Sequence, residues 1–125
     1  MDPFLVIARD DLEAVIKLLD SGVNVNHNRW SGFSLLHRAA QLGNTDICEI
    51  LLDRGADVNS KSVRGWYTPF HCALANGYIN TAEFLLSRGA KPWALSKYRE
   101  DAFDYGSKKG FKEICSDFRS KVIKM

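Results

Sequence analysis

The sequence lacks any long hydrophobic run. The longest apolar stretch near the N-terminus covers only residues 4–8, which is far short of the roughly 18 residues that a membrane-spanning helix requires. It also follows an acidic residue, Asp2, which is atypical of a secretory signal. We therefore expect a cytoplasmic protein that does not insert into a membrane, with the nucleus as the alternative location.

Cysteine is scarce. The 125 residues contain three cysteines, Cys48, Cys72 and Cys115, with no close spacing between them. An odd number of widely spaced cysteines predicts neither a disulfide framework nor a zinc site. Each lies at a predicted helical position where a small apolar residue would also serve. We therefore expect reduced cysteines whose side chains pack against their neighbours, as in a protein of a reducing compartment. No metal and no cofactor is predicted.

A strong charge of one sign is also missing. The formal net charge is +2 and the sequence pI about 8.5, which is less basic than a dedicated nucleic-acid domain usually is. The charge is uneven, however: residues 1–53 hold four basic and eight acidic side chains, residues 54–92 five and two, and residues 93–125 eight and five. Such a gradient would orient an acidic partner towards the C-terminal half.

Catalytic motifs are lacking as well. The sequence has no glycine-rich phosphate loop, no paired carboxylates and no Ser/His/Asp set. His71 and Cys72 are adjacent, but neighbouring residues on a helix point in divergent directions, so they do not form a catalytic dyad. We predict that the chain is not an enzyme and has no small-molecule substrate.

What the sequence does contain is an internal repeat of 33 or 34 residues. Residues 55–59 read Gly-Ala-Asp-Val-Asn; residues 22–26 read Gly-Val-Asn-Val-Asn, and residues 89–92 read Gly-Ala-Lys-Pro. A second phrase recurs as Ser-Leu-Leu-His at 34–37, Thr-Pro-Phe-His at 68–71 and a degenerate Asp-Ala-Phe-Asp at 101–104. A fixed period of this length is typical of stacked repeats.

Each period predicts two helices. In the second unit Ser34 is the expected N-cap of a helix over 35–42, Gly43 supplies a turn, and a second helix ends at Gly55. Thr68 and Asp101 are the equivalent caps of the third and fourth units. In the first unit Asp2 is the expected cap, and an aspartate, Asp10, stands near the missing turn glycine.

This pattern resembles the ankyrin repeat, whose consensus runs Gly-x-Thr-Pro-Leu-His, two alanines, a glycine and, after two apolar helical turns, Gly-Ala-Asp-Val-Asn. The resemblance covers roughly residues 1–118. It implies an all-α repeat solenoid: an ankyrin repeat stack of helix-turn-helix units joined by β-hairpin fingers. We expect one domain, 1–125, with repeats at about 1–26, 27–59, 60–92 and 93–125, the first and last being capping units. It also implies that His37 and His71 make structural hydrogen bonds.

The fingers depart most from the consensus, because their tips carry aromatic and basic residues together. Such residues are enriched in binding hot spots. With exposed positions of the first helices, they predict a partner-binding surface: Arg29, Trp30, Arg38, Gln41, Leu42, Arg64, Trp66, Tyr67, Asn76, Lys97, Tyr98, Arg99 and Tyr105. Cys72 and Lys108 are expected on the same side. The alternative is that Trp30 and Trp66 fold back and seal their fingers.

We therefore predict a non-enzymatic protein-protein interaction module, monomeric on its own. Its concave groove and finger tips would bind a protein segment with acidic and apolar features. The alternatives are a permanent structural subunit of a larger assembly and, on weaker grounds, nucleic-acid binding. Asn59 resembles the acceptor of asparagine hydroxylation in some ankyrin repeats, and the alternative role for it is a hydrogen bond to the next finger.

Overall fold

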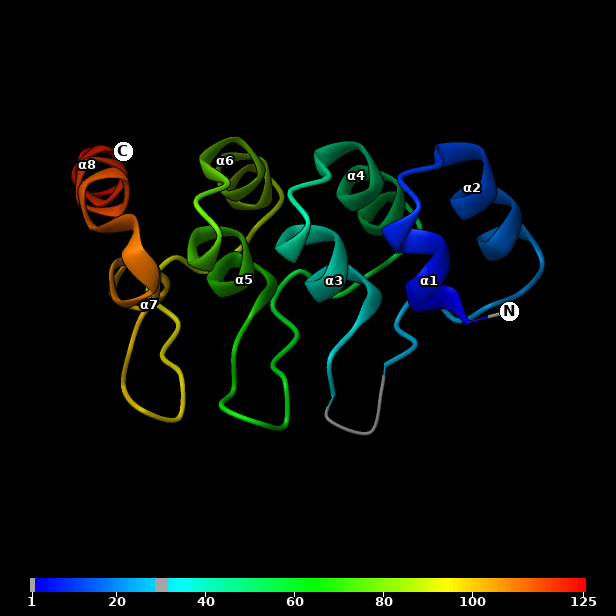
Figure 1. The fold of residues 1–125 in the computed structure, drawn as a ribbon, viewed down its shortest axis with the longest axis horizontal. Helices are drawn as coiled ribbons and strands as arrows, with labels where there is room; N and C mark the ends of the chain where they lie inside the picture. The colour runs from blue at the N-terminus through cyan, green and yellow to red at the C-terminus, as the bar shows by residue number, and fades with distance from the viewer. Residues whose placement is uncertain (1, 29–31) are drawn as a thin grey trace.

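The computed structural model describes residues 2–28 and 32–125, which fold into a row of helix pairs (Figure 1). The pairs are α1 (Pro3–Ala8) with α2 (Leu12–Asp20), α3 (Leu35–Gln41) with α4 (Thr45–Asp53), α5 (Pro69–Ala75) with α6 (Ile79–Ser87), and α7 (Ala102–Gly106) with α8 (Lys112–Ile123). A wide helical turn over Ser107–Phe111 joins α7 to α8. The predicted all-α repeat stack is confirmed.

The helices form two rows along the stack. The first helices, α1, α3, α5 and α7, lie next to the long loops, and the second helices, α2, α4, α6 and α8, form the row on the other side (Figure 1). Within the first row α3 packs on both α1 and α5, and α5 also packs on α7. Each pair thus buries its apolar side chains against its neighbours in one continuous core.

Side-chain caps begin the first helix of every pair. Ser34, Thr68 and Asp101 each accept the backbone N–H three residues on, and Asp2 accepts from Phe4 N. These contacts satisfy donors that the helix itself leaves unpaired. The predicted caps are therefore confirmed.

The fingers differ from the predicted β-hairpins. No strand forms in the described part of the chain, and the first finger contains one isolated bridge between Asn28 and Ser34. In the second finger Ser62 N donates to Tyr67 O at 2.9 Å, and in the third Ser96 N donates to Glu100 O at 2.8 Å. Each closing bond spans only a few residues, so the tips are tight turns without the length for a ladder.

Two turn glycines lie beneath an aromatic ring of the next helix pair. A Cβ on Gly43 would fall 2.6 Å from the ring of Tyr78, and a Cβ on Gly77 would fall 2.7 Å from the ring of Phe111. Both glycines also have positive φ, 70° and 73°. Glycine is required here twice, for the left-handed backbone and for the close approach of the ring.

Two buried histidines connect each first helix to the following finger. Ser34 N donates to His37 Nδ1 at 3.1 Å, which leaves the proton on Nε2, and Nε2 donates to Tyr67 O at 2.7 Å. His71 repeats the arrangement and donates from Nε2 to Glu100 O at 3.0 Å. The predicted structural role of both histidines is confirmed.

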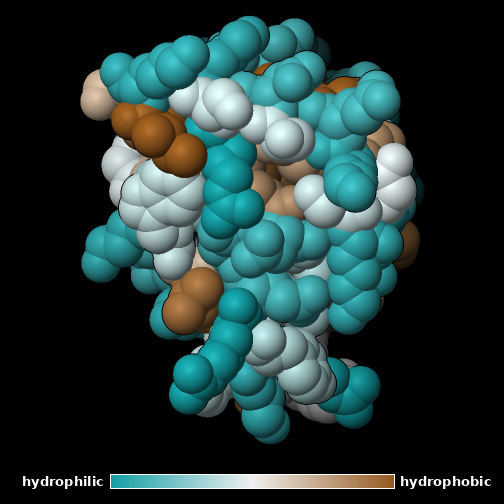
Figure 2. Space-filling model, turned by 90° about the vertical axis from the view of Figure 1, so that its left-hand side faces the viewer, coloured by the Kyte–Doolittle hydropathy of each residue, from teal (hydrophilic) through white to brown (hydrophobic). Residues whose placement is uncertain are grey.

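The C-terminal end of the stack presents a mainly hydrophilic surface with separate hydrophobic spots (Figure 2). Residues 119–124 continue α8 as far as Ile123, and Val122 is buried. Ile114 of the same helix is 45% exposed. Arg119 lies over the ring of Trp93 at 5.9 Å and pairs with Asp101, so it connects α8 to the third finger and to the start of α7.

Removing the cap of α5 should destabilise the stack. Thr68 Oγ1 accepts from His71 N at 3.3 Å and contacts His71 Nδ1 at 2.8 Å, and Thr68 is 2% exposed. We expect Thr68→Ala to lower the free energy of unfolding by about 1 to 2 kcal/mol. Urea melts would measure this, with Thr68→Ser as the control that keeps the hydroxyl, as Ser34 does. Equal losses in both variants would contradict the capping role.

Acid should also destabilise the stack through His37. Burial lowers the pKa of His37 from 6.5 to about 4 and also lowers that of His71. Between these pKa values the unfolded chain binds more protons than the folded chain, so stability is complete above about pH 6.5 and is lost as the pH falls. We expect His37 to remove about 2 kcal/mol between about pH 7.5 and pH 5.

Urea melts at the two pH values would measure this loss. The control is His37→Gln, which should be less stable at the higher pH and should lack this part of the pH dependence. A wild-type unfolding midpoint that is equal at both pH values would contradict a neutral, buried His37.

Candidate functional site

The second finger, residues 60–67, is the best-defined part of the predicted binding surface. Ser62 is 5% exposed; its Oγ donates to Arg64 O at 2.7 Å and accepts from Tyr67 N at 3.1 Å. Trp66 N donates to Ser62 O at 3.1 Å, and Lys97 N of the third finger donates to Gly65 O at 2.8 Å. These bonds fix the backbone of the tip in one conformation.

Trp66 occupies a strained backbone position at this tip. Its φ is 58°, although left-handed backbone is costly for a residue with a large side chain. The equivalent position, two residues before the cap, is Gly32 in the first finger, with φ 73°. The Trp66 side chain is 49% exposed, so the ring does not seal the finger. An exposed ring held at a conformational cost points to a function outside the fold.

Tyr67 behaves differently from Trp66, although the sequence analysis grouped the two. A Cβ on Gly65 would lie 2.3 Å from the Tyr67 ring, so this ring covers the glycine. The ring also stacks on Tyr105 of α7, with centroids 4.3 Å apart, and meets His71 edge-on at 5.7 Å. Tyr67 therefore packs the finger onto the helices and presents only part of its surface.

The third finger, residues 93–100, carries the other described tip residues. Lys97, Tyr98 and Arg99 are exposed, Tyr98 by 65%. Arg99, like Trp66, stands two residues before a cap and has positive φ, 61°. Arg29 and Trp30 of the first finger lie outside the described residues.

The first helices contribute a second group to this surface. Arg38 Nη1 donates to Gln41 Oε1 at 2.7 Å. The same two side chains line a hollow of about 310 Å³ with residues of α1 and the first finger: Phe4, Leu5, Ala8 and Phe33. Leu5 is 56% exposed there. The sequence does not mark Leu5 as exposed, because every residue of α1 is apolar and the helix has no polar face to compare it with.

Three predicted positions need correction or a narrower role. Cys72 was expected at the surface but is 8% exposed, and burial raises its pKa to about 12. Leu42 is 37% exposed, yet it lines a different hollow from Arg38 and Gln41. Asn76 is exposed, and its amide donates to Cys72 O at 3.1 Å.

Tyr105 lies where α7, the second finger and basic side chains meet. Lys109 Nζ lies 5.3 Å from the centre of its ring. Burial, with smaller contributions from Tyr67 and Cys72, raises the pKa of Tyr105 to about 12. The nearby Lys108 Nζ is 3.6 Å from Glu100 Oε2. We call the surface formed by Leu5, Arg38, Gln41, Asn76, Tyr67 and Tyr105 the inner face.

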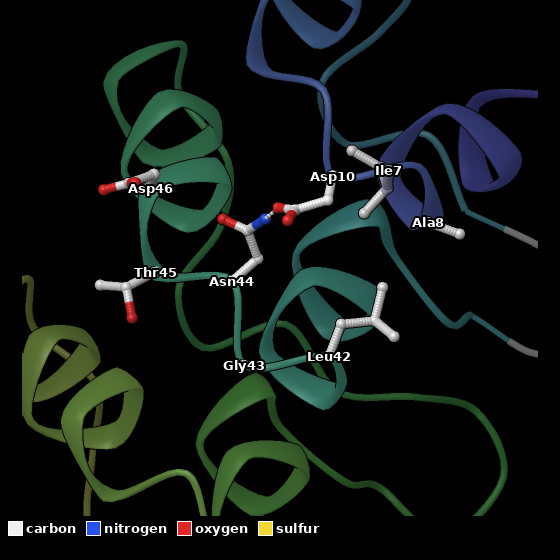
Figure 3. A pocket seen from close by; sticks show the side chains of 8 residues that line it. All are labelled: Ile7, Ala8, Asp10, Leu42, Gly43, Asn44, Thr45 and Asp46. Atoms are coloured by element: carbon white, nitrogen blue, oxygen red, sulfur yellow. Dashed lines mark hydrogen bonds between the residues drawn. The ribbon is translucent and has the colours of Figure 1, made fainter.

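Another hollow lies at the turn between α3 and α4 and has a volume of about 510 Å³ (Figure 3). Asp10, with φ 59°, replaces the turn glycine of the first unit, as predicted. Asn44 faces it: Nδ2 donates to Asp10 Oδ1, and Oδ1 accepts from Ile47 N at 2.9 Å. At the first turn this contact takes the place of the aromatic ring that covers the turn glycine in the next two units, Tyr78 over Gly43 and Phe111 over Gly77. The hollow therefore lies at the junction between the first and second repeats.

Asn59 connects its repeat to the next one. Its Nδ2 donates to Gly89 O at 3.1 Å, and its Oδ1 accepts from Lys91 N at 2.9 Å. Asn26 makes the equivalent bonds to Gly55 O and Asp57 N. The structural role is therefore present, and hydroxylation of Asn59 stays a prediction.

Comparison with known proteins agrees with this architecture. A family model described as ankyrin repeats (3 copies) matches residues 4–96. The chain belongs to the ankyrin repeat family. Ankyrin repeats generally mediate protein-protein interaction.

Curated relatives contain similar repeats within longer chains. The chain is 37% identical over 99 residues to human BCL-6 corepressor-like protein 1, covering 79% of this chain and 6% of the relative. It is 35% identical over 85 residues to mouse protein phosphatase 1 regulatory subunit 27, covering 67% and 54%. To the Arabidopsis thaliana ADP-ribosylation factor GTPase-activating protein AGD2 it is 40% identical over 90 residues, covering 72% and 11%. The match thus spans about half or less of these relatives.

Within the described residues, 2–28 and 32–125, no helix is long and apolar enough to cross a membrane. Nor do three or more His, Cys, Asp or Glu side chains gather there in a way that could hold a metal ion.

Relieving the backbone strain at Trp66 should stabilise the fold. Glycine adopts positive φ at little cost, so we expect Trp66→Gly to raise the free energy of unfolding by about 1 kcal/mol. Urea melts would measure the change. Tyr98→Gly is the matched control, because Tyr98 is similarly exposed but is not in the left-handed region; it should not stabilise. A loss of stability in Trp66→Gly would show that the ring seals the finger after all.

Proposed function

We propose that this chain is a non-enzymatic binding module that holds a segment of a partner protein against its inner face and finger tips. The observation that carries the proposal is Trp66, a half-exposed ring kept in left-handed backbone on a rigid tip. Tryptophan, tyrosine and arginine dominate binding hot spots. The exposed Tyr98 and Arg99 add these residue types on the neighbouring finger.

The charge of the fingers supports a partner with acidic and apolar features. Residues 60–67 and 93–100 contain four basic residues, Lys61, Arg64, Lys97 and Arg99, and one acidic residue, Glu100, which pairs with Lys108. Leu5, Val63 and Trp66 are exposed apolar side chains on the same surface or next to it. Carboxylates of the partner would pair with these basic groups, and its aliphatic or aromatic side chains would pack on the exposed rings. A segment with both kinds of side chain would therefore be selected.

The state of the titratable side chains supports a role without catalysis. His37 and His71 are engaged through both ring nitrogens. Burial raises the pKa of Cys48 and of Cys72 to about 12, so neither thiol forms a reactive thiolate near neutral pH. These groups serve the packing of the stack.

Two alternatives remain distinct from this proposal. A nucleic acid would use the same basic and aromatic tips, but its affinity would fall steeply with salt, whereas an aromatic-anchored protein segment would lose little. A permanent structural subunit would use its ends as well. The face shown in Figure 2 is mainly hydrophilic, so it offers little apolar area for permanent packing.

Selection from a random peptide library displayed on phage would test the proposal without knowledge of the natural partner. We expect the recovered peptides to combine acidic with apolar residues. The inner-face variant Arg38→Gln/Tyr105→Leu should weaken their binding by about 2 kcal/mol or more, measured by calorimetry. The back-face control Glu49→Gln/Glu83→Gln should bind as wild type does. Peptides without acidic residues, or equal binding by the inner-face variant, would contradict the proposal.

A further inference from the structure

The tip of the second finger contains a hollow that the inner face does not include. It has a volume of about 430 Å³ and is lined by Lys61, Ser62, Val63 and Trp66. Val63 is 67% exposed and Trp66 49%. Ser62, the buried member, uses its hydroxyl inside the finger, so the accessible wall consists of an aliphatic side chain, an indole and a lysine.

The second finger is one residue longer than the third. Its closing bond joins Ser62 to Tyr67, whereas the third finger closes from Ser96 to Glu100. The extra length places two successive residues, Gly65 and Trp66, at positive φ, 81° and 58°. In the third finger only Arg99 has positive φ. The Trp66 side chain, on this longer finger, is 49% exposed and lines the hollow with Val63.

The neighbouring fingers hold this tip in place from both sides. A Cβ on Gly32 of the first finger would lie 2.9 Å from both Val63 N and Val63 Cγ2, so the two fingers are in close contact. On the other side Lys97 N bonds to Gly65 O. A binding surface fixed in this way loses little conformational entropy when a ligand is bound.

We infer that this hollow is a separate subsite for one apolar side chain flanked by carboxylates in a protein segment. Val63 and the Trp66 ring supply the apolar contact. Lys61 stands in the wall and Arg64 is adjacent along the chain, while no carboxylate occurs between residues 60 and 66. Charge complementarity therefore favours an acidic flank. This subsite rests on the proposed function, because it is one of the places where the partner segment would be bound, and it specifies the side chains that the segment would present there.

The probe is the acetylated and amidated pentapeptide Glu-Glu-Leu-Glu-Glu, titrated into the ¹⁵N-labelled protein and followed by NMR. We expect saturable shifts of the Ser62, Val63 and Arg64 amides and of the Trp66 indole N–H. Trp66→Gly should weaken the affinity for the probe by about tenfold or more, and Lys61→Gln should weaken it by about threefold. The back-face variant Glu49→Gln/Glu83→Gln should leave the affinity unchanged.

Control probes separate the possible outcomes. Replacing leucine by alanine, or the glutamates by lysines, should abolish the shifts at the tip. Equal binding of the alanine probe, or stronger binding of oligothymidylate that shifts the same residues, would overturn the inference. The inner-face variant Arg38→Gln/Tyr105→Leu should still bind the pentapeptide. Equal binding of the library-selected peptides by that variant would therefore refute the inner face alone, while pentapeptide shifts confined to α7 would refute the tip subsite alone.

Discussion

The architecture depends on the buried imidazoles that donate across the repeat boundary. His37 Nε2 bonds to Tyr67 O and His71 Nε2 to Glu100 O, the residues that immediately precede the next caps. Each bond holds the last residue of a finger against the first helix of the unit before it. Since the other nitrogen, Nδ1, accepts from the cap residue's own N–H, one side chain sets both the start of its helix and the position of the next finger. The neutral ring is essential to the first of these tasks, because a protonated Nδ1 accepts no bond.

The fourth unit has an aspartate where the second and third units have these histidines. Asp104 accepts from Asp101 N at 3.3 Å and receives Arg119 Nη1 at 3.2 Å, so its side chain bonds within its own unit. Arg119 also lies over Phe103 at 5.4 Å, so the guanidinium covers part of the apolar side of α7.

Much of this was predictable from sequence, because the repeat's own requirements are local. The caps, the turn glycines and Asp10 follow from backbone needs that a few neighbouring residues express. What could not be predicted depends on contacts between fingers. The sequence places Trp66 and Tyr67 side by side, but only the extra residue and the bond from Lys97 N to Gly65 O decide that one ring turns outwards and the other packs on Tyr105. Leu5 and Cys72 depend in the same way on how neighbouring helices pack.

The proposed binding residues lie at positions that the repeat does not constrain, or at positions where a residue other than glycine adopts a left-handed backbone at a conformational cost. Trp66 and Arg99 both occupy the left-handed position that glycine fills in the first finger, and both are exposed. A fold that only had to be stable would place glycine there. The strain lies at the tips, away from the buried histidines and the core, so the stack tolerates it without losing its register. The finger tips can therefore vary for recognition while the helices that carry them stay fixed.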